Sequence, residues 1–96
     1  PIKVIAIDDD KKILNAIAKG IISGTVVQNP WGQCYVGSYV LAALNSKACT
    51  MKKSGLYVDS GSFLVTKANL KTYDAQRLAK SKSILKDFKT KYLTCA

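Results

Sequence analysis

Histidine and glutamate are absent from this sequence of 96 residues, and methionine and tryptophan occur once each. Without histidine, the Ser-His and Cys-His units of nucleophilic catalysis are excluded. The cysteines, Cys34, Cys49 and Cys95, lie too far apart to form a CxxC metal pair. No apolar run approaches the ~20 residues that a membrane span needs. The sequence therefore predicts neither a usual metal centre nor a transmembrane segment.

The odd number of cysteines permits at most one disulfide within a monomer. Cys34 falls on a predicted helix, on a face that packing would bury. We favour plain buried or free thiols over a structural bridge, since cysteine often behaves as a small apolar residue. The redox compartment stays open at this point.

The six acidic residues are all aspartates. Fifteen lysines and arginines outnumber them, which gives a net charge of +9. Such an excess can indicate a nucleic-acid partner. Six of the basic residues, however, lie between Arg77 and Lys91 and surround most of a predicted helix. No interleaved aromatics or DNA-reading motif accompany them, so we expect a solvated face and no nucleic-acid partner.

The first half of the chain alternates between apolar runs and helical periodicity. Residues 2–7 are rich in β-branched side chains and end in Asp8-Asp9-Asp10, a pattern typical of a buried parallel strand followed by a helix N-terminus. Either of the last two aspartates can cap that helix, which spans about ten residues and ends at Gly20. Residues 25–27 predict a second strand, which Asn29-Pro30 stops.

The second half continues the alternation. A helix from Trp31 has a core-facing stripe, residues 46–55 indicate a loop, and Leu56–Thr66 predicts an extended segment that bends at Asp59-Ser60-Gly61. An amphipathic helix is expected over Tyr73–Leu93. The order β-α-β-α-β-α predicts an α/β fold with a parallel sheet. The stripe comprises Val36, Tyr39, Val40, Ala43 and Leu44, and the apolar face of the last helix comprises Leu78, Leu85, Phe88 and Tyr92.

The acidic cluster after the first strand allows a phospho-receiver domain, in which aspartates hold a divalent metal and Asp59 would accept the phosphoryl group. The later part of the pattern fits poorly, because Thr66 and Lys67 follow Asp59 too closely to leave a helix between the strands that should present them. Pro30 also lies where the second strand should enter its helix. Short acidic motifs often match by chance, so this is the less favoured alternative.

A more specific pattern runs through Val4–Pro30, VIAIDDDKKILNAIAKGIISGTVVQNP. It resembles the ligand-binding domain of type I periplasmic sugar-binding proteins, the receptors of ABC transporters, which share their fold with the effector domains of LacI-type repressors. The matching features are a strand ending in Asp8, a helix ending in Lys19-Gly20, and a strand ending in Gln28-Asn29-Pro30. The resemblance continues through the helix 31–44, Val58–Gly61 and Phe63–Lys67.

The resemblance implies that Asp8 and Gln28 bind a sugar. A carboxylate accepts hydroxyl protons in short charge-assisted bonds, and a carboxamide matches one hydroxyl as donor or acceptor. Asp9 and Trp31 are weaker candidates, because Asp9 is also explained by the helix N-terminus and Trp31 by packing. The same resemblance implies two hinge crossings between lobes, one at Gln28-Asn29-Pro30 and one at Asp59-Ser60-Gly61.

The resemblance also implies a partial two-lobe fold of the periplasmic-binding-protein kind. Residues 1–28 would belong to the C-terminal lobe, 29–59 to the N-terminal lobe, and 62–96 would return to the C-terminal lobe as a strand and the terminal helix. Because the sequence opens on Pro1 directly before an apolar run, we expect it to be part of a longer polypeptide that supplies the missing strands. Exposed faces would then favour pairing with that upstream part or self-association, including exchange of the 31–45 helix.

The function that the resemblance implies is capture of a sugar or sugar-like ligand by an extracytoplasmic receptor, periplasmic or lipid-anchored at the cell surface. The ligand would pass to ABC transporter permease subunits, with no catalysis and no cofactor. The alternative is the effector-binding domain of a LacI-type transcriptional regulator.

Overall fold

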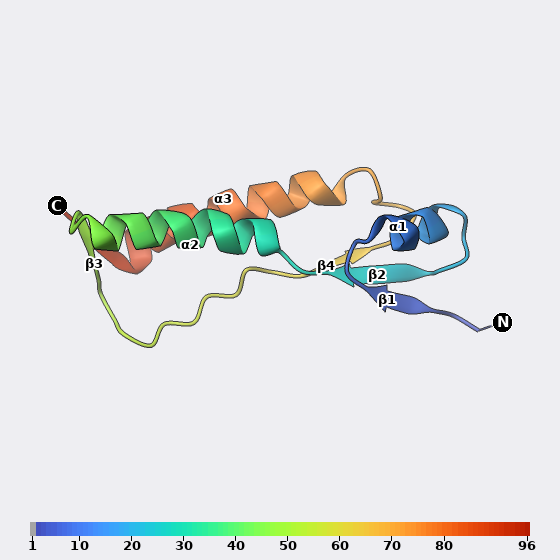
Figure 1. Cartoon of the computed structure of the whole chain (residues 1–96), viewed down its shortest axis with the longest axis horizontal. Coiled ribbons are helices and arrows are strands. Elements are labelled where there is room, and N and C mark those ends of the chain that lie inside the picture. The colour runs from blue at the N-terminus through green and yellow to red at the C-terminus, as the bar shows by residue number, and fades with distance from the viewer. Residues whose placement is uncertain (1) are drawn as a thin grey trace. The chain divides into compact units, whose positions relative to one another are not determined.

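The computed structural model describes residues 2–96, and its chain divides into two compact units (Figure 1). Unit 1 comprises Pro1–Asn29 and Gly61–Arg77, and unit 2 comprises Pro30–Ser60 and Leu78–Ala96. The chain therefore passes between the units after Asn29, after Ser60 and after Arg77. Whether the units are parts of two receptor lobes stays a prediction.

Unit 1 contains a sheet of three strands with the order β1-β2-β4. Strands β1 (Ile5–Ile7) and β2 (Gly24–Val27) are parallel, and helix α1 (Lys11–Ala18) connects them. Strand β4 (Phe63–Val65) runs antiparallel to β2. The first turn of helix α3 (Tyr73–Lys91) completes the unit.

Both ends of α1 form as the sequence predicts. The Asp10 carboxylate caps the helix by accepting from the amide of Lys12 at 2.8 Å. After the last turn, Gly20 adopts a φ of 79° and donates to the carbonyl of Ile17, while Ile21 donates to Ala16. These two bonds form a Schellman motif, in which the left-handed residue is usually glycine because it carries no Cβ.

The predicted all-parallel β-α repeat is wrong, because β4 is antiparallel to its neighbour, with Thr25 opposite Val65 and Val27 opposite Phe63. The reason lies in the path of the chain. It leaves unit 1 just after the C-terminal end of β2 and re-enters at Gly61, two residues before β4 begins. A strand that starts where its neighbour ends runs back along it, whereas a parallel strand needs a crossover within the same unit.

The two faces of this sheet differ in burial. Val27, Val65 and Tyr73 form the core, with Leu14 and Leu70 packed against them. Residues on the opposite face remain exposed although they are apolar, so the prediction that the first strand is buried is wrong. The exposed fractions on that face are 58% for Ile5, 68% for Ile7, 39% for Val26 and 58% for Leu64.

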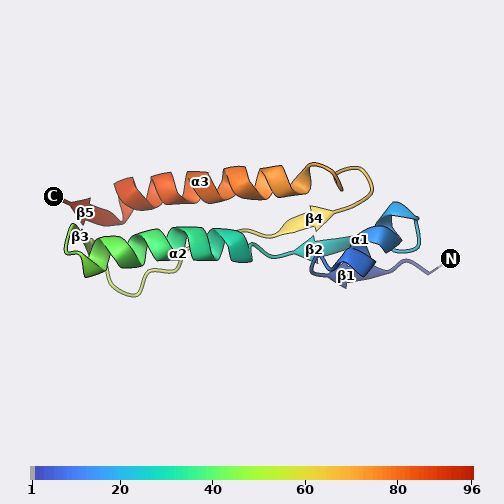
Figure 2. The same ribbon diagram turned by 45° about the horizontal axis from the view of Figure 1, so that its top comes forward.

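Unit 2 is built on two helices, α2 (Pro30–Asn45) and the greater part of α3, which lie side by side in both views (Figures 1 and 2). Two strands of three residues each, β3 (Cys49–Met51) and β5 (Leu93–Cys95), pair antiparallel. Neither strand was predicted, since residues 46–55 were interpreted as a loop and the last helix was expected to extend to Leu93. The segment 56–58 is not a strand.

A disulfide joins Cys49 and Cys95, which are directly opposite each other in this small sheet. The preference for free thiols was therefore wrong for this pair. Cys34 is the free cysteine, and it is exposed rather than buried on its helix. Cys34 directly follows Gln33 on α2, and its side chain is exposed to solvent.

The predicted stripe on α2 is only partly buried. Val36 is buried, whereas Tyr39 is 40% exposed and has the Lys89 ammonium 4.3 Å from its ring centroid. Such a cation–π contact uses the aromatic face without removing it from water. Among the described residues, no helix is both long enough and apolar enough to cross a membrane.

Candidate ligand-binding site

Asp8 immediately follows β1, and β2 holds it through two hydrogen bonds to its backbone. Its amide donates to the carbonyl of Val26 at 2.8 Å, and its own carbonyl accepts from the Thr25 hydroxyl at 2.6 Å. The backbone of Asp8 has a φ of 77°, in the left-handed region that few residues other than glycine occupy. Thr25 is fully buried, so this strained residue is anchored to the interior of unit 1.

Gln28 follows the neighbouring strand, β2, at the same edge of the sheet, because Ile7 pairs with Val26 in the parallel register. Both side chains are exposed. Within residues 2–96, neither the Asp8 carboxylate nor the Gln28 carboxamide takes part in a hydrogen bond or an ion pair with another side chain. The edge therefore presents a carboxylate and a carboxamide, the pair of groups that the sequence suggested for a polyol. Their ligand role stays a prediction.

Asp9 has structural partners instead. Its carboxylate accepts from the Tyr73 hydroxyl at 3.1 Å and forms an ion pair with Arg77 at 3.2 Å. Arg77 also binds Asp74 at 2.6 Å and donates to the carbonyl of Gln28 at 3.3 Å. This network ties the start of α3 to the ends of β1 and β2, so Arg77 supports the backbone of a candidate ligand residue.

Burial and the nearby carboxylate affect the ionisation of this network. The pKa of Tyr73 is raised above 10.0, first because the side chain is desolvated and then because Asp9 accepts its proton and repels the phenolate. Desolvation lowers the pKa of Arg77, but the hydrogen bond and charge of Asp74 and the charge of Asp9 outweigh it and raise that pKa. Arg77 is therefore a permanent cation at this sheet edge.

The neighbouring aspartates Asp9 and Asp10 bind different partners. Asp10 caps α1 and Asp9 pairs with Arg77, so their carboxylates have separate tasks. Over the described residues, no three potential ligands of a metal ion come together. Asp59, the residue that a receiver domain would phosphorylate, belongs to unit 2, whereas the three aspartates belong to unit 1.

Trp31, the weaker ligand candidate, lies in unit 2 on the first turn of α2. Its ring stacks on Tyr35 with 4.8 Å between centroids and an interplanar angle of 19°. It is 46% exposed.

The predicted hinge residues fall at two passages between the units, where Asn29 is fully buried and Gly61 has a φ of 89°.

The sequence interpretation missed the network around Arg77, although two signals for it were available. Arg77 is the one arginine among fifteen basic residues, and arginine is favoured where a planar fork binds carboxylates. Asp74 stands three residues before it on the same helix, at the spacing of an ion pair.

Comparisons of this chain with protein-family models, with curated proteins and with solved structures found no match.

Proposed function

We propose that this chain is part of an extracytoplasmic receptor that captures a sugar or similar polyol for an ABC transporter. The observation that carries the proposal is the edge formed by Asp8 and Gln28. The backbone of Asp8 is fixed against β2 on both sides, and its carboxylate is exposed beside the end of a second strand. Hydroxyl groups need acceptors whose positions are set before binding.

The proposal rests on these residues and on the sequence resemblance, not on the topology of the sheet. Capture involves binding without bond cleavage, which agrees with a chain that has no histidine. The proposed partners are the polyol, the permease subunits and the remainder of the polypeptide.

The disulfide supports an extracytoplasmic location, because such bonds persist mainly in oxidising compartments. For the same reason it favours a receptor over the effector domain of a cytosolic repressor.

The decisive experiment is calorimetric titration of pentoses, hexoses and sugar alcohols into the natural polypeptide that contains this sequence. We expect one of them to bind. Asp8→Asn and Gln28→Ala should each weaken binding by roughly 1–3 kcal/mol, since the first replaces a charge-assisted hydrogen bond with a neutral one and the second removes the hydrogen bond of the carboxamide. That range is roughly 5- to 150-fold in Kd.

Asp10→Asn is the matched control. It makes the same change of charge two residues away, and asparagine caps helices about as well as aspartate, so the fold is kept. We expect its Kd to equal that of the natural sequence. Failure of every sugar to bind, or equal losses in the Asp8 and Asp10 variants, would overturn the proposal.

A further inference from the structure

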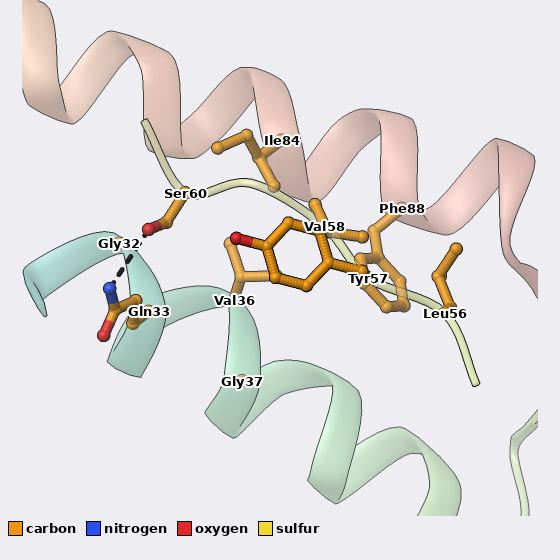
Figure 3. A pocket seen from close by; sticks show the side chains of 10 residues that line it. All are labelled: Gly32, Gln33, Val36, Gly37, Leu56, Tyr57, Val58, Ser60, Ile84 and Phe88. Atoms are coloured by element: carbon orange, nitrogen blue, oxygen red, sulfur yellow. Dashed lines mark hydrogen bonds between the residues drawn. The ribbon is translucent and has the colours of Figure 1, made fainter. Parts of the chain in front are cut away.

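Unit 2 contains a cavity of about 390 Å³ that the proposed sugar site does not use (Figure 3). Its walls come from α2, from the extended segment 56–60 and from α3. Most of the lining is apolar, with Val36 on α2, Leu56 and Val58 on the extended segment, and Ile84 and Phe88 on α3. This volume lies within the range of ~300–1,000 Å³ that is usual for small-molecule sites.

A glycine borders this space. Gly37 lines the cavity on α2, and a Cβ placed there would meet no atom within 4 Å. In a helix interior, glycine costs roughly 1 kcal/mol relative to alanine. The helix therefore gives up stability at a position that borders the cavity.

One end of the cavity is polar. The Gln33 carboxamide donates to the Ser60 hydroxyl at 3.1 Å, and this pair stands across the mouth between α2 and the extended segment (Figure 3). The side-chain oxygen Oε1 of Gln33 makes no hydrogen bond within residues 2–96. It can accept one proton from a ligand.

The remaining lining decides the ligand's charge and shape. None of the lining residues is charged, so an ion would lose its hydration without a counter-charge. Phe88 already contacts Tyr92 edge to face, with 5.4 Å between centroids, and Tyr57 is 87% exposed at the open side. A flat ligand ring can make similar contacts with the aromatic rings of Phe88 and Tyr57, which both line the cavity.

We propose that this cavity binds a small neutral aromatic compound with one hydroxyl group, a phenol, whose ring contacts Phe88 and whose hydroxyl donates to Gln33. The inference is independent of the polyol site, because it concerns residues of unit 2 alone.

The test uses phenol, toluene and benzoate, with binding followed by the amide resonances of residues 32–37 and 56–60. Phenol should give saturable shifts, toluene should bind roughly fivefold more weakly because it lacks the hydrogen bond, and benzoate should not bind. Gln33→Leu should abolish the preference for phenol over toluene.

Gly37→Leu should abolish phenol binding while raising the melting temperature, because it fills the cavity and improves the helix. This result separates loss of the site from loss of the fold. Ala42→Leu, at an exposed position on the same helix outside the cavity, is the matched control and should bind phenol normally. Unchanged binding in Gly37→Leu, absence of saturable shifts with phenol, or benzoate binding as tightly as phenol would each overturn the proposal. The Gly37 experiment and the sugar titration with Asp8→Asn test different sites, so either can fail without affecting the other.

Discussion

Tyr73 illustrates how a single residue can link the core to a charged edge. Its ring is 7% exposed and belongs to the core of unit 1, yet its hydroxyl donates to Asp9 beside the ends of the strands. Arg77 lies 5.5 Å from the centroid of the same ring. The carboxylate, the phenol and the guanidinium therefore hold the first turn of α3 to the sheet as one group.

The raised pKa of Tyr73 predicts a loss of stability in alkaline solution. The folded state binds the phenolic proton more tightly than the unfolded state, so this contribution is complete below pH 10.0 and disappears as pH rises through the folded pKa. Tyr73→Phe should lower the free energy of unfolding by about 1 kcal/mol at neutral pH, through loss of one hydrogen bond. Its stability should also fall less steeply above pH 10 than that of the natural sequence.

Urea unfolding between pH 7 and pH 11 measures both effects. Tyr57→Phe is the control, since that ring is 87% exposed, and it should leave the stability curve unchanged. Parallel curves for Tyr73→Phe and the natural sequence above pH 10 would refute the linkage.

At the scale of elements, two glycines in different settings predict opposite effects of one methyl group. Gly24 begins β2, where a Cβ would stand 2.9 Å from the carbonyl oxygen of Val65 on β4. A backbone atom cannot move away cheaply, so Gly24→Ala should destabilise unit 1 by about 1–3 kcal/mol. Gly37→Ala meets no atom and should stabilise α2 by about 1 kcal/mol.

Thermal unfolding of the two variants, compared with the natural sequence, tests this contrast. Both carry the same chemical change, so each is the control for the other. Stabilisation by Gly24→Ala would contradict the close approach of β2 and β4, and destabilisation by Gly37→Ala would contradict the open space beside α2.

The sequence was sufficient to predict the elements that have strong local signals. Asp10 and Gly20 mark the ends of α1 through capping chemistry, and the apolar periodicity predicted α2 and α3. The direction of β4 was not predictable from Phe63–Val65 itself, because a three-residue strand has the same pattern in either direction. It follows from where the chain re-enters unit 1, which is a tertiary property.

In the candidate site, too, the features with a local sequence signal were predictable and those set by tertiary structure were not. Asp8 and Gln28 were each predicted to end a strand, and the parallel register of β1 and β2 places the ends of these strands at one edge. The role of Asp9 was not predictable, since its partners Tyr73 and Arg77 are 64 and 68 residues away in sequence. The strands β3 and β5 were missed for a similar reason, because only their pairing makes Cys49 and Cys95 neighbours.

For the whole molecule, the disulfide closes a loop with a sequence separation of 46 residues and should stabilise unit 2 by about 4 kcal/mol. Reduction should therefore lower the stability of unit 2 most, measured as faster amide exchange in α2 than in α1. A thiol assay on the unfolded chain should find one reactive group before reduction and three after it. Cys34→Ser, at an exposed position, should leave the stability unchanged, and three reactive thiols without reductant would exclude the bond.

The passages of the chain between the units mean that neither unit is one continuous stretch of sequence. Truncation at a single position therefore cannot isolate either unit in complete form. The exposed residues 52–55 lie within the span that Cys49 and Cys95 enclose, so a peptide bond hydrolysed there leaves both pieces covalently attached. The protein can thus be nicked beside the exposed residues Lys52 and Lys53 and stay one covalent molecule until a reductant separates the pieces.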